Sequence, residues 1–64
     1  MRKLKEIIDK SGIKKRYIAD MLGISRAALY NKLNGEAEFL PSEIKCLQIL
    51  LRLSDAEVKY IFLS

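Results

Sequence analysis

The sequence predicts an all-α fold of five short helices, and three of its features lead to that prediction. Apolar residues recur three and four positions apart in five segments, as on the buried stripe of an amphipathic helix, and no segment has the pattern of a strand. Glycine, proline and serine stand between the segments, where helices begin and end. The predicted connections have about two to seven residues, as in compact helical domains. For a chain of 64 residues we expect a single domain, residues 1–64.

The first two helices are predicted to end at glycines. Gly12 follows the first apolar stripe and Gly23 follows the second, and glycine readily adopts the left-handed conformation that ends many helices. The stripes consist of Leu4, Ile7 and Ile8 in the first helix and of Ile18, Met21 and Leu22 in the second.

Capping residues mark the other three helices. Ser25 is a good N-cap for the third helix, because its hydroxyl can accept from a free first-turn amide, and the Asn-Gly pair at 34–35 ends that helix. Pro41 suits the first turn of the fourth helix, which we expect to run to about Leu53. The segment "SDAE" (54–57) matches a capping box and opens the fifth helix. The expected inward-facing residues are Ala28, Leu29 and Leu33 in the third helix and Val58, Ile61 and Phe62 in the fifth.

The fourth helix carries more apolar residues than one buried stripe needs. Two stripes lie about a quarter turn apart, so we expect this helix to be buried on more than one side. The surplus favours a second copy of the chain as the cover, which predicts a homodimer; the alternative is that the first and fifth helices cover both stripes. The stripes are Ile44, Leu47 and Leu51, and Cys46, Ile49, Leu50 and Leu53; Tyr60, Leu63 and Phe39 are expected to add to the dimer surface. For Phe39 the sequence also predicts a hydrophobic plug at the start of the fourth helix.

Composition argues against several classes of protein. No run of about 18 apolar residues is present to span a membrane, and charges occupy the N-terminal segment where a signal peptide is apolar, so we expect a cytoplasmic protein. The single cysteine excludes an internal disulfide and a Cys-based zinc site, and histidine is absent. The sequence also shows no glycine-rich phosphate loop and no pair of acids in a plausible cleft. We therefore expect the chain to be neither an enzyme nor a cofactor- or metal-binding protein.

Positive charge is concentrated in the first half of the chain. Residues 1–32 hold nine Lys or Arg and three Asp or Glu, a net charge of +6, whereas residues 33–64 have a net charge of −2. A basic half and an acidic half indicate a polyanionic partner on one side of the molecule; the alternative is an uneven solvated surface.

A very short turn joins the second and third helices. Only Gly23 and Ile24 separate Leu22 from the expected N-cap Ser25, and a tight glycine-containing turn between two steeply angled helices is the helix-turn-helix unit. Ala19 is expected where the two helices cross, because a larger side chain would push them apart.

The exposed face of the third helix differs from an ordinary solvent face. If Leu29 and Leu33 face inward at about 100° per residue, small and polar residues lie opposite, and the chain has no acid over residues 21–35. Arg can reach two acceptors on guanine, Asn pairs well with adenine, and Ala can pack on a thymine methyl group. The outward residues are Ala27, Asn31 and Asn34, flanked by Arg26 and Tyr30.

At these residues the chain resembles a known family. The stretch "IKKRYIADMLGISRAALYNKLNG" is similar to the helix-turn-helix of the lambda-repressor-like, or Cro/repressor-type, DNA-binding domains, and the order of five helices matches that family over the whole chain. The stretch "ISRAALYNKLNGEAEFLPSEI" is most similar to small phage Cro-like regulators. The resemblance implies a five-helix lambda-repressor-like bundle containing a helix-turn-helix.

The resemblance also implies roles for individual residues. In this family the start of the second helix anchors a DNA phosphate, often through Gln where this chain has Lys15, and the start of the third helix enters the major groove. The implied base contacts are Ser25, Arg26, Ala27, Tyr30 and Asn31, with packing against a neighbouring helix as the alternative for the Tyr30 ring. The implied DNA backbone contacts are Lys14, Lys15, Arg16, Lys32, Asn34 and Gly35.

Two residues depart from the family pattern. Lys14 stands where the second helix usually has a Ser, Thr or Asn N-cap, so we expect its first turn to fray. Lys32 stands at a usually apolar position; we expect Leu33 to fill that space while the Lys32 stem lies along the surface.

The residues and the resemblance together predict a sequence-specific double-stranded DNA-binding transcriptional regulator, a phage or prophage Cro-like repressor that reads the major groove with its third helix. A symmetric homodimer would bind a palindromic operator, with no small-molecule substrate and no membrane involved. The alternative is a protein-interaction module, of antitoxin or antirepressor type, that uses the apolar surface of the fourth and fifth helices.

Overall fold

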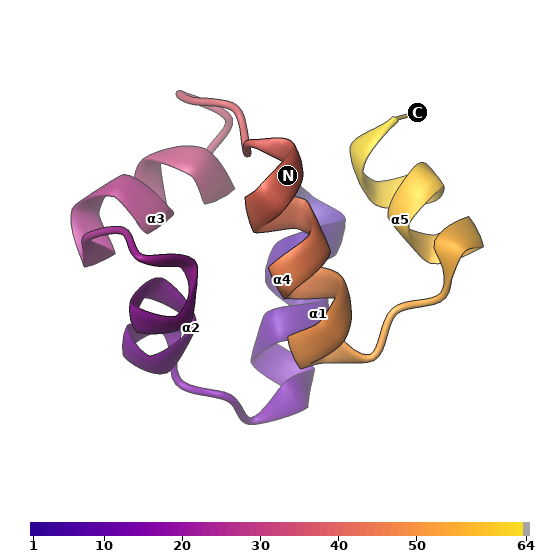
Figure 1. Ribbon diagram of the computed structural model, residues 1–64, viewed down its shortest axis with the longest axis horizontal. Helices are drawn as coiled ribbons and strands as arrows, with labels where there is room; N and C mark the ends of the chain where they lie inside the picture. The colour runs from indigo at the N-terminus through magenta and orange to yellow at the C-terminus, as the bar shows by residue number, and fades with distance from the viewer. Residues whose placement is uncertain (64) are drawn as a thin grey trace.

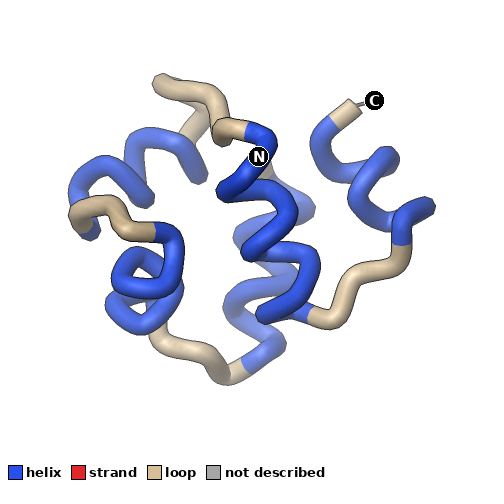
Figure 2. The backbone as a smooth tube through the Cα atoms, viewed as in Figure 1, coloured by secondary structure: helices blue, strands red, loops and turns tan. Residues whose placement is uncertain are grey.

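The computed structural model describes residues 1–63 and confirms the all-α prediction, because five helices and no strand occur in that part of the chain (Figure 1, Figure 2). No helix within the described range is long and apolar enough to cross a membrane. The helices are α1 (Arg2–Ser11), α2 (Lys15–Leu22), α3 (Arg26–Leu33), α4 (Pro41–Leu51) and α5 (Asp55–Phe62).

Four of the five helices enclose the hydrophobic core. In Figure 1, α4 and α1 occupy the middle of the molecule, with the α2–α3 pair on one side and α5 on the other. α2 packs against α3 and α4, and α1 packs against the same two helices. The buried hydrophobic cluster consists of Leu4, Ile8, Ile18, Ala19, Leu29, Leu33, Phe39 and Leu47. α5 contributes no buried residue to it.

α4 ends slightly earlier than the sequence predicts. Its last helical residue is Leu51, and Arg52 takes the left-handed conformation with φ 54°. The Leu53 amide then donates to the Gln48 carbonyl oxygen at 2.9 Å, which closes the turn and returns the Leu53 side chain to the interior. Leu53 is therefore buried because the chain turns back after the helix, and its apolar character alone could not distinguish this from one more helical residue.

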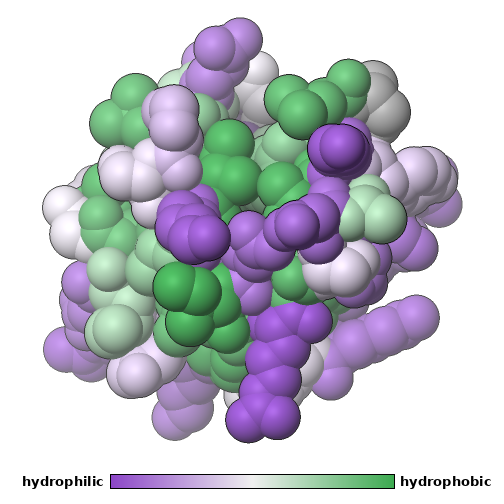
Figure 3. All heavy atoms as spheres, turned by 45° about the vertical axis from the view of Figure 1, so that its right-hand side comes forward, coloured by the Kyte–Doolittle hydropathy of each residue, from purple (hydrophilic) through white to green (hydrophobic). Residues whose placement is uncertain are grey.

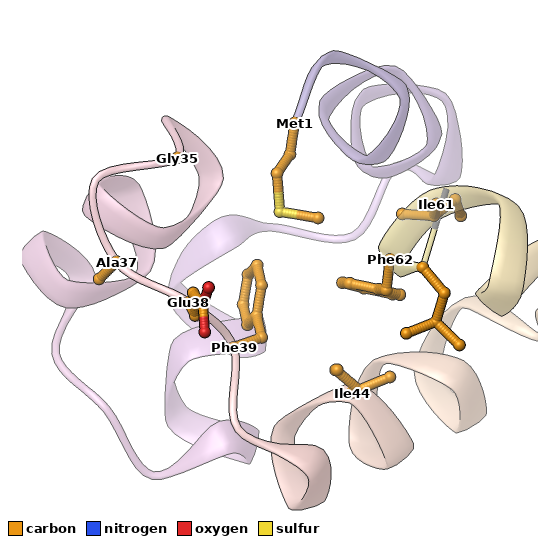
Figure 4. Close-up of a pocket in the computed structure, with 9 residues that line it drawn as sticks. Met1, Gly35, Ala37, Glu38, Phe39, Ile44, Ile61 and Phe62 are labelled. Atoms are coloured by element: carbon orange, nitrogen blue, oxygen red, sulfur yellow. The ribbon is translucent and has the colours of Figure 1, made fainter.

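Met21 lies where the sequence prediction is wrong, and Phe39 takes one of its two predicted places. Met21 was expected on the buried stripe of α2 but is half exposed, because Ile18 and Ala19 fill the core beneath that helix. Phe39 is buried as the plug at the start of α4 and not on the dimer surface, and its ring meets Phe62 edge to face, with centroids 5.8 Å apart and planes at 84° (Figure 4).

α5 has well-formed local structure but few anchors. The predicted capping box is confirmed: the Glu57 amide donates to Ser54 Oγ at 3.1 Å, and the Ser54 amide donates to Glu57 Oε1 at 2.9 Å. The helix is attached through Ile61 and Phe62, which are partly buried against the core, and through Asp55 Oδ1, which accepts from Gln48 Nε2 of α4 at 2.8 Å. A cavity of about 420 Å³ remains between these residues, the segment before α4 and Met1 (Figure 4).

Candidate nucleic-acid interface

The turn between α2 and α3 closes on its own backbone. Gly23 has φ 73°, and its amide donates to the Asp20 carbonyl oxygen at 3.1 Å, while the Ile24 amide donates to the Ala19 carbonyl oxygen at 3.0 Å. Residues with a Cβ resist this left-handed conformation, so glycine suits the position. Ala19 is also buried in the core, so the turn is anchored to the interior through the same residue.

α3 is fixed by one cap and two buried leucines. Ser25 is the N-cap, as predicted, and its Oγ accepts from the Ala28 amide at 3.0 Å. Leu29 and Leu33 are fully buried, which confirms them as the inward residues. A hydroxyl can donate as well as accept, so capping leaves the Ser25 hydrogen available to another acceptor.

The opposite side of α3 is open to solvent. Ser25, Arg26, Ala27 and Asn31 are exposed, and Tyr30 is 43% exposed. We call these five residues the α3 face. No part of the described chain covers Arg26 or Asn31. Both side chains are therefore accessible to a partner. The groups that the α3 face offers are hydrogen-bonding groups: a guanidinium, a carboxamide and two hydroxyls.

Three basic residues stand at the N-terminal end of α2. Lys14 is the N-cap and makes no side-chain capping bond, so the first-turn amides of α2 have no capping side chain as acceptor. Lys14 and Arg16 are exposed, while Lys15 Nζ lies 3.3 Å from Asp9 Oδ1 on α1. Free amides and positive charge at a helix N-terminus both attract anions.

The C-terminal end of α3 presents Asn34 and Gly35. Gly35 has φ 83°, and the Glu36 amide donates to the Asn31 carbonyl oxygen at 2.9 Å, which closes the helix. Both residues are exposed, and Asn34 Oδ1 accepts from Lys5 Nζ at 2.6 Å. Nothing in the sequence pattern marks Lys5 for this place. Its position follows from the packing of α1 on α3, which helical periodicity does not reveal.

Lys32 does not join these residues. Its Nζ lies 2.5 Å from Glu43 Oε1, and the two side chains are 13% and 6% exposed. The Leu40 amide donates to the same carboxylate oxygen at 2.8 Å, and the Lys32 ammonium lies 5.9 Å from the Phe39 ring centroid. The expectation that the Lys32 stem lies along the surface is wrong, because a carboxylate of α4 holds its ammonium inside. We therefore leave Lys32 out of the interface.

Two glutamates have shifted acidities. Burial disfavours the charged form of Glu43, but the hydrogen bond and charge of Lys32 and the Leu40 amide outweigh it and lower the pKa of Glu43 below its ordinary value. The hydrogen bonds from the Ser54 amide and hydroxyl likewise lower the pKa of Glu57. Both groups stabilise helix starts and lie outside the α3 face.

Within residues 1–63, no group of three or more His, Cys, Asp or Glu side chains is arranged to hold a metal ion. Comparison of the chain with protein-family models, with curated proteins and with solved structures found no match.

Proposed function

We propose that this protein is a sequence-specific double-stranded DNA-binding transcriptional regulator, related to the Cro/repressor-type regulators that its sequence resembles. The observation that carries the proposal is the α3 face: a helix anchored by two buried leucines directs a guanidinium and a carboxamide outward, with no acid in residues 21–35. A fixed edge of donors and acceptors suits the base edges of a duplex groove, and the lack of acids avoids repulsion by the phosphates.

The residues of the α3 face have distinct expected roles. Arg26 lies in the first turn of α3, where a major-groove helix usually meets base edges, and it can donate two hydrogen bonds to guanine. Asn31 can pair with adenine, and Ala27 can pack on a thymine methyl group. Ser25 and Tyr30 add hydroxyls at either side.

The DNA backbone contacts lie at both ends of the unit formed by α2 and α3. Basic side chains neutralise phosphates, which supplies sequence-independent affinity and makes binding sensitive to salt. They also set the register in which the α3 face meets the bases. The proposed backbone contacts are Lys14, Lys15 and Arg16 at the start of α2, and Asn34 and Gly35 after α3.

A homodimer on a palindromic operator is part of the proposal. Exposed apolar side chains support it: Ile49 on α4 is 67% exposed, and Tyr60 and Leu63 are 64% and 75% exposed. Figure 3, which turns the α5 side of the molecule forward, shows hydrophobic residues interspersed with hydrophilic ones on this face. Two α3 helices about 34 Å apart would then read two half-sites, and the bound dimer would exclude polymerase. Activation is the other mode of regulation that this geometry allows.

The same exposed apolar residues favour one other function, a protein-interaction module whose main partner covers α4 and α5. A fluorescence-anisotropy titration with pooled random duplexes distinguishes the two. A DNA-binding protein binds the pool with a Kd that rises steeply as salt increases from about 50 to about 200 mM. An interaction module shows no salt-dependent binding to DNA, and that result would contradict our proposal.

Arg26 tests the assignment of the α3 face. On a duplex selected for tight binding, Arg26→Ala should weaken binding by about 1–3 kcal/mol, while binding to random duplexes is nearly unchanged. Lys59→Ala is the control, because it removes a positive charge from α5. Equal losses on selected and random DNA would show that Arg26 contacts a phosphate and reads no base.

A further inference from the structure

A shallow depression of about 230 Å³ lies where α1 meets the α2–α3 pair. Two lysines, a tyrosine, an amide and a carboxylate surround a buried leucine there. We call it the α1–α3 depression, and its lining residues are Lys5 and Asp9 from α1, Lys15 from α2, and Tyr30, Leu33 and Asn34 from α3. Tyr30 also belongs to the α3 face, so the depression adjoins the proposed base-reading edge.

The two lysine ammonium groups of the depression keep hydrogen-bond donors beyond those in the hydrogen bonds described above. Lys5 Nζ donates to the amide oxygen of Asn34, a neutral acceptor, so this bond holds the ammonium without neutralising its charge. Lys15 Nζ donates to Asp9 Oδ1. An ammonium has three donors, so each of these bonds leaves donors for another acceptor. The apolar side chain of Leu33 lowers the local dielectric constant, which strengthens attraction to an anion.

The Lys15–Asp9 pair is unequally exposed. The Asp9 side chain is 67% exposed, whereas that of Lys15 is 33% exposed. Asp9 can therefore turn toward water without losing buried contacts, while packing keeps the Lys15 stem in place. An anion that enters the depression can take the place of the Asp9 carboxylate at Lys15.

We propose that the α1–α3 depression binds one phosphate of the duplex backbone between the ammonium groups of Lys5 and Lys15, and that Asp9 competes with this phosphate for Lys15. The inference rests on the proposed function, because the phosphate belongs to the duplex that the α3 face reads. It assigns Lys5 to the interface. It also offers the Tyr30 hydroxyl a phosphate oxygen as acceptor, in addition to the base edge proposed above. Asp9 becomes an internal counter-ion that limits the affinity for DNA.

Removal of the Asp9 charge should therefore tighten binding. We expect Asp9→Asn to lower the Kd for pooled random duplexes about three- to five-fold, the range of one partly exposed ion pair. Glu6→Gln is the matched control: it makes the same charge change on α1, at a residue paired with the exposed Arg2. Screening limits its effect to less than about two-fold.

A double-mutant cycle separates competition at Lys15 from a general effect of charge. In a Lys15→Gln background, Asp9→Asn should no longer tighten binding, because the group for which Asp9 competes is absent. Lys5→Gln should weaken binding and flatten the salt dependence by about one unit of slope. Lys3→Gln, which removes the same charge from the part of α1 that faces α5, should do neither.

Amide chemical shifts in ¹H–¹⁵N spectra locate the site. The random duplexes should shift the amides of Lys5, Lys15 and Tyr30, and inorganic phosphate alone should shift the same amides at higher concentration. If the wild-type protein binds no duplex, the proposed function and this inference fail together. If it binds duplexes, but Asp9→Asn and Glu6→Gln have equal effects, the depression is no phosphate site and the proposed function stands.

Discussion

α3 and α5 are the same length but are held very differently. Each has eight residues and follows a serine whose hydroxyl accepts from a first-turn amide. α5 has the stronger local signals. Its capping box has two reciprocal hydrogen bonds, and the carboxylates of Asp55 and Glu57 interact favourably with the positive end of the helix dipole. Nevertheless α3 buries two leucines completely, and α5 buries none of its residues.

The comparison separates what starts a helix from what fixes it in place. Caps determine the first turn, whereas buried side chains hold the helix against the rest of the molecule. α3 even begins with Arg26, a cation at the positive end of the dipole, which is locally unfavourable. Such a conflict between local and global preference is expected where a residue serves a function.

The largest expected difference between the two helices concerns their buried residues. Leu29→Ala in α3 should lower the free energy of unfolding by about 2–5 kcal/mol, because it leaves a cavity in the core. Ile61→Ala in α5 should lower it by only about 1 kcal/mol, since that side chain is partly exposed. Urea unfolding followed by far-UV circular dichroism measures both, and equal losses would contradict the account of α5 as weakly anchored.

The Lys32–Glu43 ion pair ties α3 to α4 and is largely buried, whereas the hydrogen bond from Gln48 Nε2 on α4 to Asp55 Oδ1 on α5, at 2.8 Å, is exposed. Lys32→Met should lower the free energy of unfolding by about 1–3 kcal/mol, because it leaves a buried carboxylate with only the Leu40 amide. The salt dependence of DNA binding should not change. Lys45→Met, at an exposed residue of α4, should affect stability by less than about 0.5 kcal/mol. A reduced salt slope in Lys32→Met would return Lys32 to the DNA interface.

The serine caps should act on different scales. Ser25→Ala should lower the free energy of global unfolding by about 1 kcal/mol, because α3 is part of the cooperative core. Ser54→Ala should instead speed hydrogen exchange in α5 with a smaller change in global stability, since α5 can open locally. Exchange mapped by nuclear magnetic resonance measures both effects. Global loss from Ser54→Ala as large as that from Ser25→Ala would show that α5 belongs to the core.

The smallest expected effect is a dependence of stability on pH. Because the folded state lowers the pKa of Glu43 below its ordinary value of 4.5, this carboxylate stabilises the fold above that pH, and the contribution is lost as pH falls through the folded-state pKa. Glu57 acts in the same direction. Glu43→Gln should flatten the decline of the unfolding free energy below about pH 5. Glu38→Gln, at an exposed residue, serves as the control, and an equally steep decline in Glu43→Gln would assign it to other groups.

The sequence predicted the features that depend on neighbours along the chain. The serine caps at Ser25 and Ser54, the glycine after α2 and the inward leucines of α3 are each visible within one or two turns. Residues joined across the fold were missed, because periodicity gives no information on how helices pack together. Lys32 meets Glu43 across a loop, and Lys5 meets Asn34 only because α1 lies against α3.

The candidate site divides in the same way. The outward direction of Arg26 and Asn31 follows from the helical repeat once Leu29 is placed inside, so the sequence sufficed to predict it. The ion pair between Lys15 and Asp9 depends on how closely α1 approaches α2, so only the structure could reveal it.

Selection of bound duplexes from a random pool, carried out with the wild-type protein and with Arg26→Ala, tests most directly whether the α3 face reads DNA. The account predicts an enriched palindromic motif for the wild-type protein and loss of preference at one position of each half-site for the variant. No enriched motif, or the same motif for both proteins, would contradict it.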